Sequence, residues 1–142
     1  DWLDYNGHMN VAYYFKVFET ASVELWNSLG IGAQYAEHEN NCMEIKETHI
    51  QFIDEAHLGD TLRIESRVYI VRESGMLVGQ EMFCGGQLLC RQEHWDSNVD
   101  LRNGNISPFE KKTLGKIRLA CSEIRKVHPE WIGRSVRMRN SK

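Results

Sequence analysis

The heptapeptide DYNGHMN, close to the start of the chain, concentrates side chains that can do chemistry. It brings the carboxylate of Asp4 and the imidazole of His8 together with amide side chains at Asn6 and Asn10. A carboxylate can act as a general base or as a nucleophile toward an activated carbonyl. Backbone N–H groups at a helix start are unpaired and can hold a developing oxyanion. If a helix follows directly, the segment predicts a catalytic corner in which Asp4 is the general base or nucleophile and the Gly7 and His8 amides hold an oxyanion.

Two other structures compete for the same segment. Asn6-Gly7 is a strong hairpin signal, but a hairpin needs a strand on both sides, and the residues from Val11 onward have helical spacing. We therefore expect a strand-to-helix corner, in which the glycine relieves a tight backbone. A calcium loop is excluded, because Trp2 and Tyr13 stand where such a loop needs an acid or amide and its closing glutamate.

The element that must position this corner is a helix over residues 11–29. Asn10 is suited to cap its start, and Gly30 is suited to end it. Apolar residues recur mostly at steps of three and four, which predicts an amphipathic helix: Val11, Tyr14, Phe15, Phe18, Ala21, Leu25 and Leu29. A helix with so apolar a face is expected to be covered by a sheet.

Beyond this helix the sequence changes to the period-two alternation of β-strands. Gly85-Gly86 is suited to a two-residue hairpin turn, and residues 73–75 form the turn before it. Residues 30–41 and the polar stretch 96–105 are expected to be loops. We expect four antiparallel strands, over residues 43–52, 61–71, 76–84 and 87–95.

The alternation also assigns residues to the faces of the strands. Ile50 and Phe52 are expected on one face of the first strand, with His49 and Gln51 on the other. A sheet with one buried and one wetter face follows from this pattern. In the second strand, the apolar residues are expected on one side: Leu62, Ile64, Val68 and Ile70.

A second helix is predicted after the strands. Ser107 can be its N-cap, Pro108 its first residue and Glu110 the partner in a capping box. The helix is expected to reach about Val127, and the basic tail from Gly133 is expected to be frayed. Helix, strands and helix in this order predict a single α+β domain, with the sheet curled around the first helix.

Composition and charge restrict the classes of protein. No apolar run approaches the about 18 residues that span a membrane. The four cysteines fit no zinc-binding spacing, and free thiols favour a cytoplasmic protein. Residues 1–110 carry 7 Lys/Arg against 18 Asp/Glu, whereas residues 111–142 carry 10 against 2. The basic segment can meet a phosphate-bearing ligand, RNA or the acidic body of its own domain, and we expect no nucleic-acid or membrane partner.

These segments resemble a known family. DYNGHMN before an aromatic-rich helix, then ETHIQFIDEAHLGDTL, EMFCGGQLLCRQEHW and SPF, are similar to hotdog-fold acyl-CoA thioesterases of the 4-hydroxybenzoyl-CoA thioesterase type, closest to the betainyl-CoA (carnitine-pathway) branch. The resemblance runs from Asp1 to about Lys112. It implies a hydrolase that cleaves an acyl-CoA thioester with no metal or other cofactor. It also implies a homodimer or homotetramer with active sites at the subunit interface, and a first strand upstream of Asp1.

The resemblance assigns roles to residues. The family's catalytic acid maps onto Asp4, and the backbone at Gly7 and His8 is expected to polarise the thioester. Glu19, on the first helix, is a reserve catalytic acid. The alternatives are a non-catalytic acyl-CoA-binding or regulatory hotdog domain and a hotdog enoyl-CoA hydratase, whose motif has a proline and one more residue between acid and histidine. Substrate contacts are expected from five residues: Asn6, Asn10, Tyr14, Thr48 and His49.

Overall fold

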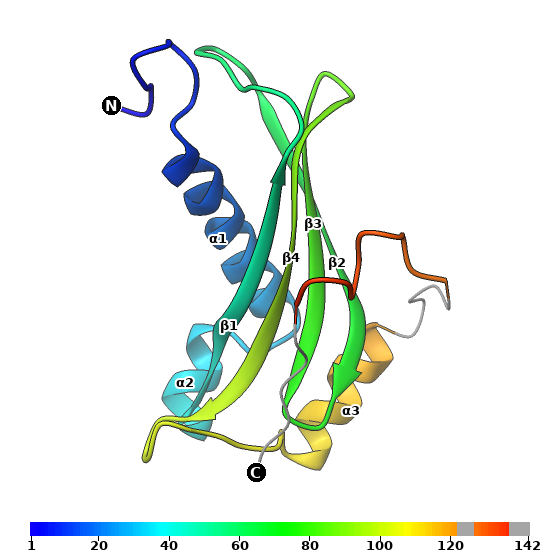
Figure 1. Ribbon diagram of the computed structural model, residues 1–142. Coiled ribbons are helices and arrows are strands. Elements are labelled where there is room, and N and C mark those ends of the chain that lie inside the picture. The colour runs from blue at the N-terminus through cyan, green and yellow to red at the C-terminus, as the bar shows by residue number, and fades with distance from the viewer. Residues whose placement is uncertain (122–126, 137–142) are drawn as a thin grey trace.

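A long helix, α1 (Val11–Ser28), lies against one face of an antiparallel sheet in the computed structural model, which describes residues 1–121 and 127–136 (Figure 1). The strands follow the order β1-β4-β3-β2, and β5 pairs with the end of β4. The predicted α+β architecture is confirmed, as are the four long strands. Their bounds are β1 (Asn41–Phe52), β2 (Leu62–Arg72), β3 (Gly75–Cys84), β4 (Gln87–Asp100) and β5 (Asn105–Ile106).

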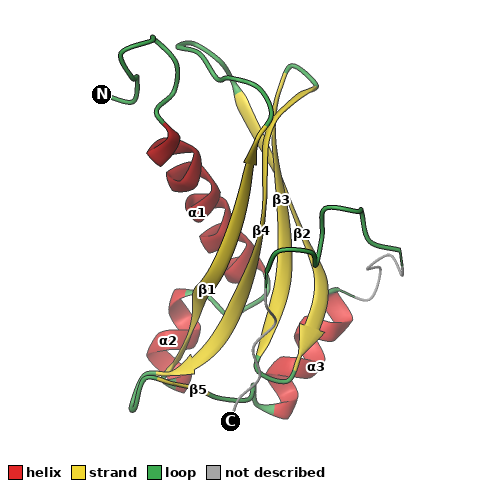
Figure 2. Cartoon of the chain, in the orientation of Figure 1, coloured by secondary structure: helices red, strands yellow, loops and turns green. Residues whose placement is uncertain are grey.

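Two shorter helices, α2 (Ala33–Glu39) and α3 (Lys111–Ala120), lie at one end of the sheet, and the N-terminal segment lies at the other (Figure 2). Helix α2 falls where the sequence predicts a loop, because its seven residues are too few to display a helical period. Its buried Tyr35 donates to Asn98 Oδ1 at 2.8 Å. None of the described helices is long and apolar enough to cross a membrane.

Helix α1 begins and ends close to where the sequence predicts. The Asn10 side chain accepts the Ala12 N–H at 3.0 Å, which satisfies one of the amides that a helix start leaves unpaired. At the other end, the Ile31 N–H donates to Trp26 O at 2.9 Å. This bond belongs to a Schellman motif, which requires a left-handed residue, here Gly30 with φ 73°.

Strand β4 continues past Trp95 to Asp100, through residues that the sequence predicts to be a loop. The polar side chains in this stretch are buried because they find partners inside the fold. Asp96, for example, accepts the Trp26 Nε1–H at 2.8 Å. Polar groups that are hydrogen-bonded are readily accommodated in a protein interior, so polarity is a misleading loop signal here.

A β-bulge in β2 corrects the predicted face of Ile70. The pairing of β2 with β3 shifts register between Val68 and Ile70, and one extra residue reverses the alternation that follows. Val68 packs in the core on the α1 side, whereas Tyr69 and Ile70 pack on the opposite face. Leu62 and Ile64 pack on the α1 side, as predicted.

The C-terminal helix begins later than predicted. Its N-cap is Glu110 rather than Ser107, and the cap makes no side-chain hydrogen bond. The carbonyl and hydroxyl oxygens of Ser107 instead accept bonds from the Asn98 side chain, at 3.0 and 3.2 Å, which keeps this residue beside the sheet. Helix α3 ends before the predicted Val127, and residues 122–126 lie outside the described part of the chain.

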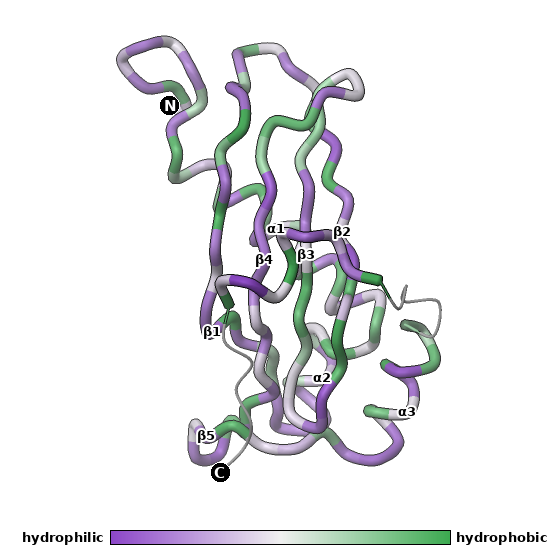
Figure 3. The backbone as a smooth tube through the Cα atoms, turned by 45° about the vertical axis from the view of Figure 1, so that its right-hand side comes forward, coloured by the Kyte–Doolittle hydropathy of each residue, from purple (hydrophilic) through white to green (hydrophobic). Residues whose placement is uncertain are grey.

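Residues 127–136 cross the face of the sheet opposite α1, where β2 and β3 carry their most hydrophobic stretches (Figure 3). Ile132 and Val136 pack there against Tyr69, Leu77 and Trp95. The prediction of a frayed tail is therefore wrong up to residue 136, and residues 137–142 are not described.

The carboxylate of Glu93 helps to hold the crossing segment to the sheet. Glu93, in β4, is fully buried. Its oxygens accept the backbone N–H groups of Gly133 at 2.5 Å, Ser135 at 2.8 Å and Val136 at 3.1 Å. Charge-assisted bonds of this kind are among the strong ones in proteins, so the segment is fastened by both apolar packing and charge.

Candidate active site

A miniature β-hairpin stands immediately before α1. Leu3 and Met9 are antiparallel bridge partners. The Asp4 N–H donates to His8 O at 2.9 Å, and the Gly7 N–H donates to Asp4 O at 3.1 Å. Gly7 has φ 79°, which is the left-handed residue of a three-residue hairpin loop. The predicted corner without a hairpin is therefore wrong, because a single bridged pair of residues is enough to serve as strands.

The carboxylate of Asp4 is held by the backbone of its own hairpin. Its Oδ1 accepts the Asn6 N–H at 2.8 Å and the His8 N–H at 3.2 Å. The other oxygen, Oδ2, has no hydrogen-bond partner among residues 1–121 and 127–136. Asp4 is half-buried. A carboxylate that is fixed at one oxygen and free at the other suits a general base or a nucleophile.

The amides of Gly7 and His8 are already bonded to Asp4, one to its carbonyl and one to its carboxylate. The His8 amide thus orients the acid and the Gly7 amide closes the hairpin loop, whereas the sequence predicts that both receive a substrate carbonyl. Asn6 also contributes through its backbone N–H, and its exposed position leaves the side chain toward solvent. Two amides of the hairpin, those of Asn6 and His8, therefore position the carboxylate.

Both oxygens of Asn10 likewise accept backbone N–H groups of the first turn of α1. Its side chain takes the Ala12 N–H, and its carbonyl accepts the Tyr13 N–H at 2.9 Å. The Val11 N–H is left without an acceptor in the described part of the chain, and Val11 is 63% exposed. This amide lies at the positive end of the helix, so it is an unpaired donor that can donate to a ligand oxygen.

Tyr14 fastens the hairpin to the loop between β1 and β2. Its hydroxyl accepts the Ala56 N–H at 2.8 Å, and Ala56 O accepts the Met9 N–H at 2.9 Å. The ring meets Phe52 edge-on, with centroids 5.3 Å apart. Burial raises the pKa of the Tyr14 hydroxyl. This residue, predicted to touch substrate, therefore acts in the structure as a buried support for the corner.

Two aromatic rings stack beside the start of α1. Trp2 and Tyr13 have ring centroids 4.6 Å apart and planes 18° from parallel. Trp2 is 50% exposed, and its carbonyl accepts the Asn10 N–H at 2.8 Å, which ties the stack to the helix start. An exposed aromatic surface of this kind can attract a cation.

Strand β1 divides its two predicted site residues between the faces of the sheet. Thr48 bonds Gln92 Oε1 on the α1 side at 3.2 Å. His49 lies on the opposite face, as the register partner of Glu93. The predicted alternation of β1 is confirmed, since Ile50 packs on the α1 side. Within one chain, the sheet therefore separates His49 from α1.

Glu19, the reserve acid, lies on α1 and pairs with a neighbour on the same helix. Its Oε2 is 3.0 Å from Lys16 Nζ, and its side chain is 38% exposed. No described contact joins it to Asp4. In this structure Glu19 therefore belongs to the helix surface rather than to the hairpin corner.

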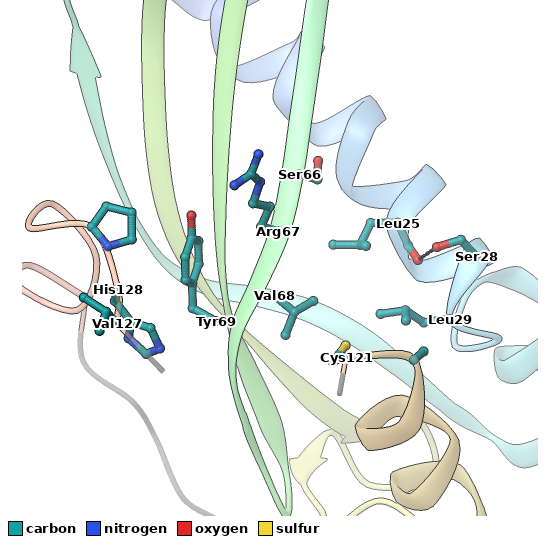
Figure 4. A pocket seen from close by; sticks show the side chains of 12 residues that line it. Leu25, Ser28, Leu29, Ser66, Arg67, Val68, Tyr69, Cys121, Val127 and His128 are labelled. Carbon is teal, nitrogen blue, oxygen red and sulfur yellow. Dashed lines mark hydrogen bonds between the residues drawn. The ribbon is translucent and has the colours of Figure 1, made fainter. Parts of the chain in front are cut away.

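A cavity of about 720 Å³ lies away from the hairpin, beside β2 and lined by residues of α1, the end of α3 and residues 127–129 (Figure 4). Leu25, Leu29 and Val68 give it an apolar wall, and Arg67 stands at its edge. None of the predicted site residues lines this cavity. In a single chain, the reactive corner is thus identified by its hydrogen bonds rather than by a deep hollow.

A buried polar layer between α1 and the sheet is absent from the sequence prediction. Gln80 Nε2 donates to Ser22 Oγ of α1 at 3.3 Å and to Ser66 Oγ at 3.0 Å. Gln92 Nε2 donates to Gln80 Oε1 at 2.5 Å. The signal that could have revealed this layer is the run of polar residues at every second position of β4 from Gln92 onward, since such residues share one face of a strand.

The family of the chain follows from comparison with known proteins. The model of the Thioesterase-like superfamily matches residues 1–117, so the chain belongs to this family. Two solved structures share the fold. A hypothetical protein of Staphylococcus aureus in complex with CoA has a TM-score of 0.83 at 18% identity, covering 91% of this chain and 83% of that one. The DHNA-CoA thioesterase of the same organism has a TM-score of 0.75 at 13% identity, covering 89% of each chain.

Two curated relatives carry more specific names. The chain is 28% identical over 138 residues to an L-carnitine dehydrogenase/betainyl-CoA thioesterase of Ruegeria pomeroyi, covering 96% of this chain and 28% of that protein. It is 24% identical over 139 residues to a betainyl-CoA thioesterase of Pseudomonas aeruginosa, covering 96% of this chain and 87% of that protein. The chain therefore spans under a third of the first relative and most of the second.

Proposed function

We propose that this protein hydrolyses an acyl-CoA thioester to the free acid and coenzyme A. The observation that carries the proposal is the state of Asp4. One carboxylate oxygen is fixed by two backbone amides, and the other is free just before the start of α1. Membership of the Thioesterase-like superfamily and the names of the relatives support the same activity. A thioester is an activated acyl group, so a positioned acid and an oxyanion donor suffice.

Two routes use the free oxygen of Asp4. As a nucleophile, it attacks the thioester carbon, the coenzyme A thiolate leaves, and water hydrolyses the resulting anhydride. As a general base, it takes a proton from the water that attacks the same carbon, and this proton passes to the leaving thiolate. In both routes the Asn6 and His8 amides hold the acid in place, and the carbonyl oxygen faces the Val11 N–H.

The test is hydrolysis of a panel of acyl-CoA thioesters by the wild type, Asp4→Asn and a matched control, Asp54→Asn, which neutralises an exposed acid of the β1–β2 loop. We expect turnover by the wild type and the control, and a loss of at least ~100-fold in Asp4→Asn. An active Asp4→Asn together with an inactive Glu19→Gln would move the role to Glu19.

The alternatives have their own outcomes in the same panel. Tight binding of acyl-CoA without turnover would favour a non-catalytic acyl-CoA-binding or regulatory domain. Addition of water to an enoyl-CoA, without release of coenzyme A, would favour a hydratase. Release of a free thiol, followed with a thiol reagent, separates both from hydrolysis.

A small acyl group with a trimethylammonium head, as in betainyl-CoA, is the substrate that fits best. Both curated relatives described above bear that name. The stacked Trp2 and Tyr13 offer an aromatic surface beside the helix start, where a quaternary ammonium can bind by cation–π attraction. The neutral isostere 3,3-dimethylbutyryl-CoA has the same shape without the charge. We expect a preference of about 10-fold for betainyl-CoA, reduced in Trp2→Leu, and equal rates would reject the cationic substrate but not the hydrolase.

The working unit that we propose is a homodimer or homotetramer with the active site at the subunit interface. Strand β1 is twelve residues long and lies at an edge of the sheet, and a long open edge is a template for pairing with a second chain. Exposed apolar residues near the hairpin, Val11, Phe52 and Ile53, would be covered by such a partner. Light scattering that gives only a monomer at micromolar concentration would reject this assembly. The free cysteines support a cytoplasmic location.

A further inference from the structure

Three potential metal ligands meet where the hairpin touches the loop between β1 and β2. One ligand atom each from His8, Glu55 and His57 lies within 4.8 Å of the other two. His8 Nδ1 is 3.3 Å from Glu55 Oε1, and the two imidazole rings meet edge-on with centroids 5.1 Å apart. All three side chains are at least partly exposed, so an ion can enter from solvent.

These distances are close to those of a metal centre. In a tetrahedral zinc site with bonds of about 2.0–2.1 Å, neighbouring ligand atoms lie about 3.3–3.4 Å apart. The contact between His8 and Glu55 already has this length. The other pairs of ligand atoms lie within 4.8 Å of one another, so their separations exceed the zinc value by at most about 1.5 Å. Rotation of the exposed His57 side chain can close that gap, because a surface imidazole is free to change rotamer.

The backbones that carry the ligands are fixed to one another. His8 and His57 are antiparallel bridge partners, and the Met9 N–H donates to Ala56 O at 2.9 Å. Ala56 is 1% exposed, and its own N–H is held by the buried Tyr14 hydroxyl. The ligands therefore stand on a framework that does not need to fold around the ion, which favours binding.

We propose that His8, Glu55 and His57 form a binding site for one divalent transition-metal ion of the zinc class. Two imidazoles and one carboxylate are typical ligands for zinc, cobalt or nickel, whereas magnesium and calcium prefer oxygen ligands throughout. Asp60 Oδ2 lies 3.9 Å from His57 Nδ1. A small shift would let this carboxylate accept the Nδ1–H and orient the imidazole. The ion would bind the His8 imidazole, whereas the His8 backbone N–H holds Asp4. The site therefore adjoins the proposed acid without using its carboxylate, and its effect is to clamp the hairpin onto the β1–β2 loop.

The sequence gives no warning of this site. His8 lies nearly fifty positions before Glu55 and His57 in the chain, so no ligand spacing of the kind used to recognise zinc sites connects the three. The cysteines, which carry most such motifs, take no part. Only the docking of the hairpin on the loop brings the imidazoles together.

Calorimetric titration of the metal-free protein with ZnCl2 tests the proposal without any substrate. We expect one equivalent to bind to the wild type, and binding to weaken at least 10-fold in both His57→Ala and Glu55→Gln. The matched control is His38→Ala, which removes an exposed histidine of α2 outside the cluster and should bind as the wild type does. Unchanged affinity in both cluster variants, or loss of binding in the control as well, overturns the proposal.

Thermal unfolding gives a second, independent measurement. An ion that binds the folded protein at about 100 times its dissociation constant should raise the Tm by about 5 °C or more. The rise should be absent in His57→Ala, and MgCl2 should give none in the wild type. Because neither measurement involves hydrolysis, an inactive wild type would reject the thioesterase and leave the metal site standing. A wild-type Tm that ZnCl2 does not change would reject the metal site and leave the proposed thioesterase activity standing.

Discussion

Nδ1 of His94 lies 2.5 Å from Oδ1 of Asp96, and both side chains are fully buried between α1 and the sheet. Oδ2 of the same carboxylate accepts the Trp26 Nε1–H from α1. The buried carboxylate of Asp96 therefore links His94 of β4 to Trp26 of α1, the helix that begins directly after the hairpin. His94 Nε2 has no partner among the described residues, so Asp96 is the main polar support of this imidazole.

Removal of the Asp96 carboxylate should be strongly destabilising. Asp96→Ala leaves a buried imidazole and a buried indole N–H without partners, and breaking a buried pair costs about 3–5 kcal/mol. Trp26→Phe removes one hydrogen bond and should cost about 1–2 kcal/mol. Urea denaturation at neutral pH measures both free energies of unfolding. Equal losses in the two variants would show that the contact between His94 and Asp96 adds nothing.

Gly7→Ala should destabilise the hairpin that holds Asp4. A Cβ at this position meets nothing within 4 Å, so the penalty comes from φ 79° alone. A left-handed alanine costs about 1–2 kcal/mol. Gly115→Ala is the matched control, since it lies in α3 with open space around it and no left-handed backbone. It should stabilise the protein by about 0.5–1 kcal/mol, as measured by thermal unfolding.

Glu93→Gln should release the segment that crosses the sheet. The three backbone N–H donors lose a charged acceptor while the shape of the side chain is kept, which should cost about 2–3 kcal/mol. Trypsin cleavage after the exposed Arg134 reports the release directly and should become faster than in the wild type. Glu81→Gln, on β3, is the control. Equal cleavage rates in the two variants would contradict the role of Glu93.

Burial raises the pKa of the Cys90 thiol to about 12. The folded state therefore retains a proton that an unfolded cysteine loses at about pH 8.5. Iodoacetamide at about that pH should modify Cys90 in urea but not in the native protein, as mass spectrometry of the peptides can show. Above this pH the folded protein keeps the Cys90 proton and the unfolded chain does not. The free energy of unfolding should therefore fall as the pH rises toward 12. Rapid labelling of native Cys90 would contradict this.

The elements that the sequence predicts well are those whose burial is apolar. Helix α1 shows its period because its buried face is apolar, and its ends carry Asn10 and Gly30. The far half of β4 is hidden, because its inward residues are polar and pair with Trp26 and Tyr35 from distant helices. The local pattern can show that these residues share one face of β4, but it cannot identify partners more than sixty residues away.

The candidate site divides in the same way. Asp4 is recognisable from its neighbours, because the hairpin and the helix start are both local. The hydrogen-bond partners of the Gly7 and His8 amides cannot be recognised from the sequence, because they depend on which acceptors the folded loop places beside them. The cluster of His8, Glu55 and His57 depends on two loops docking.

The acid that we assign to the chemistry is also the residue on which its loop is built, because Oδ1 of Asp4 accepts two of the loop's amides. Any replacement must therefore supply an acceptor at the same place, or the hairpin reorganises. Asparagine keeps an oxygen there and exchanges only the reactive one for an amide. Asp4→Asn should thus be a correctly folded but inert copy of the protein. Mixed with an intact acyl-CoA, it is the form in which the uncleaved substrate can be trapped and seen.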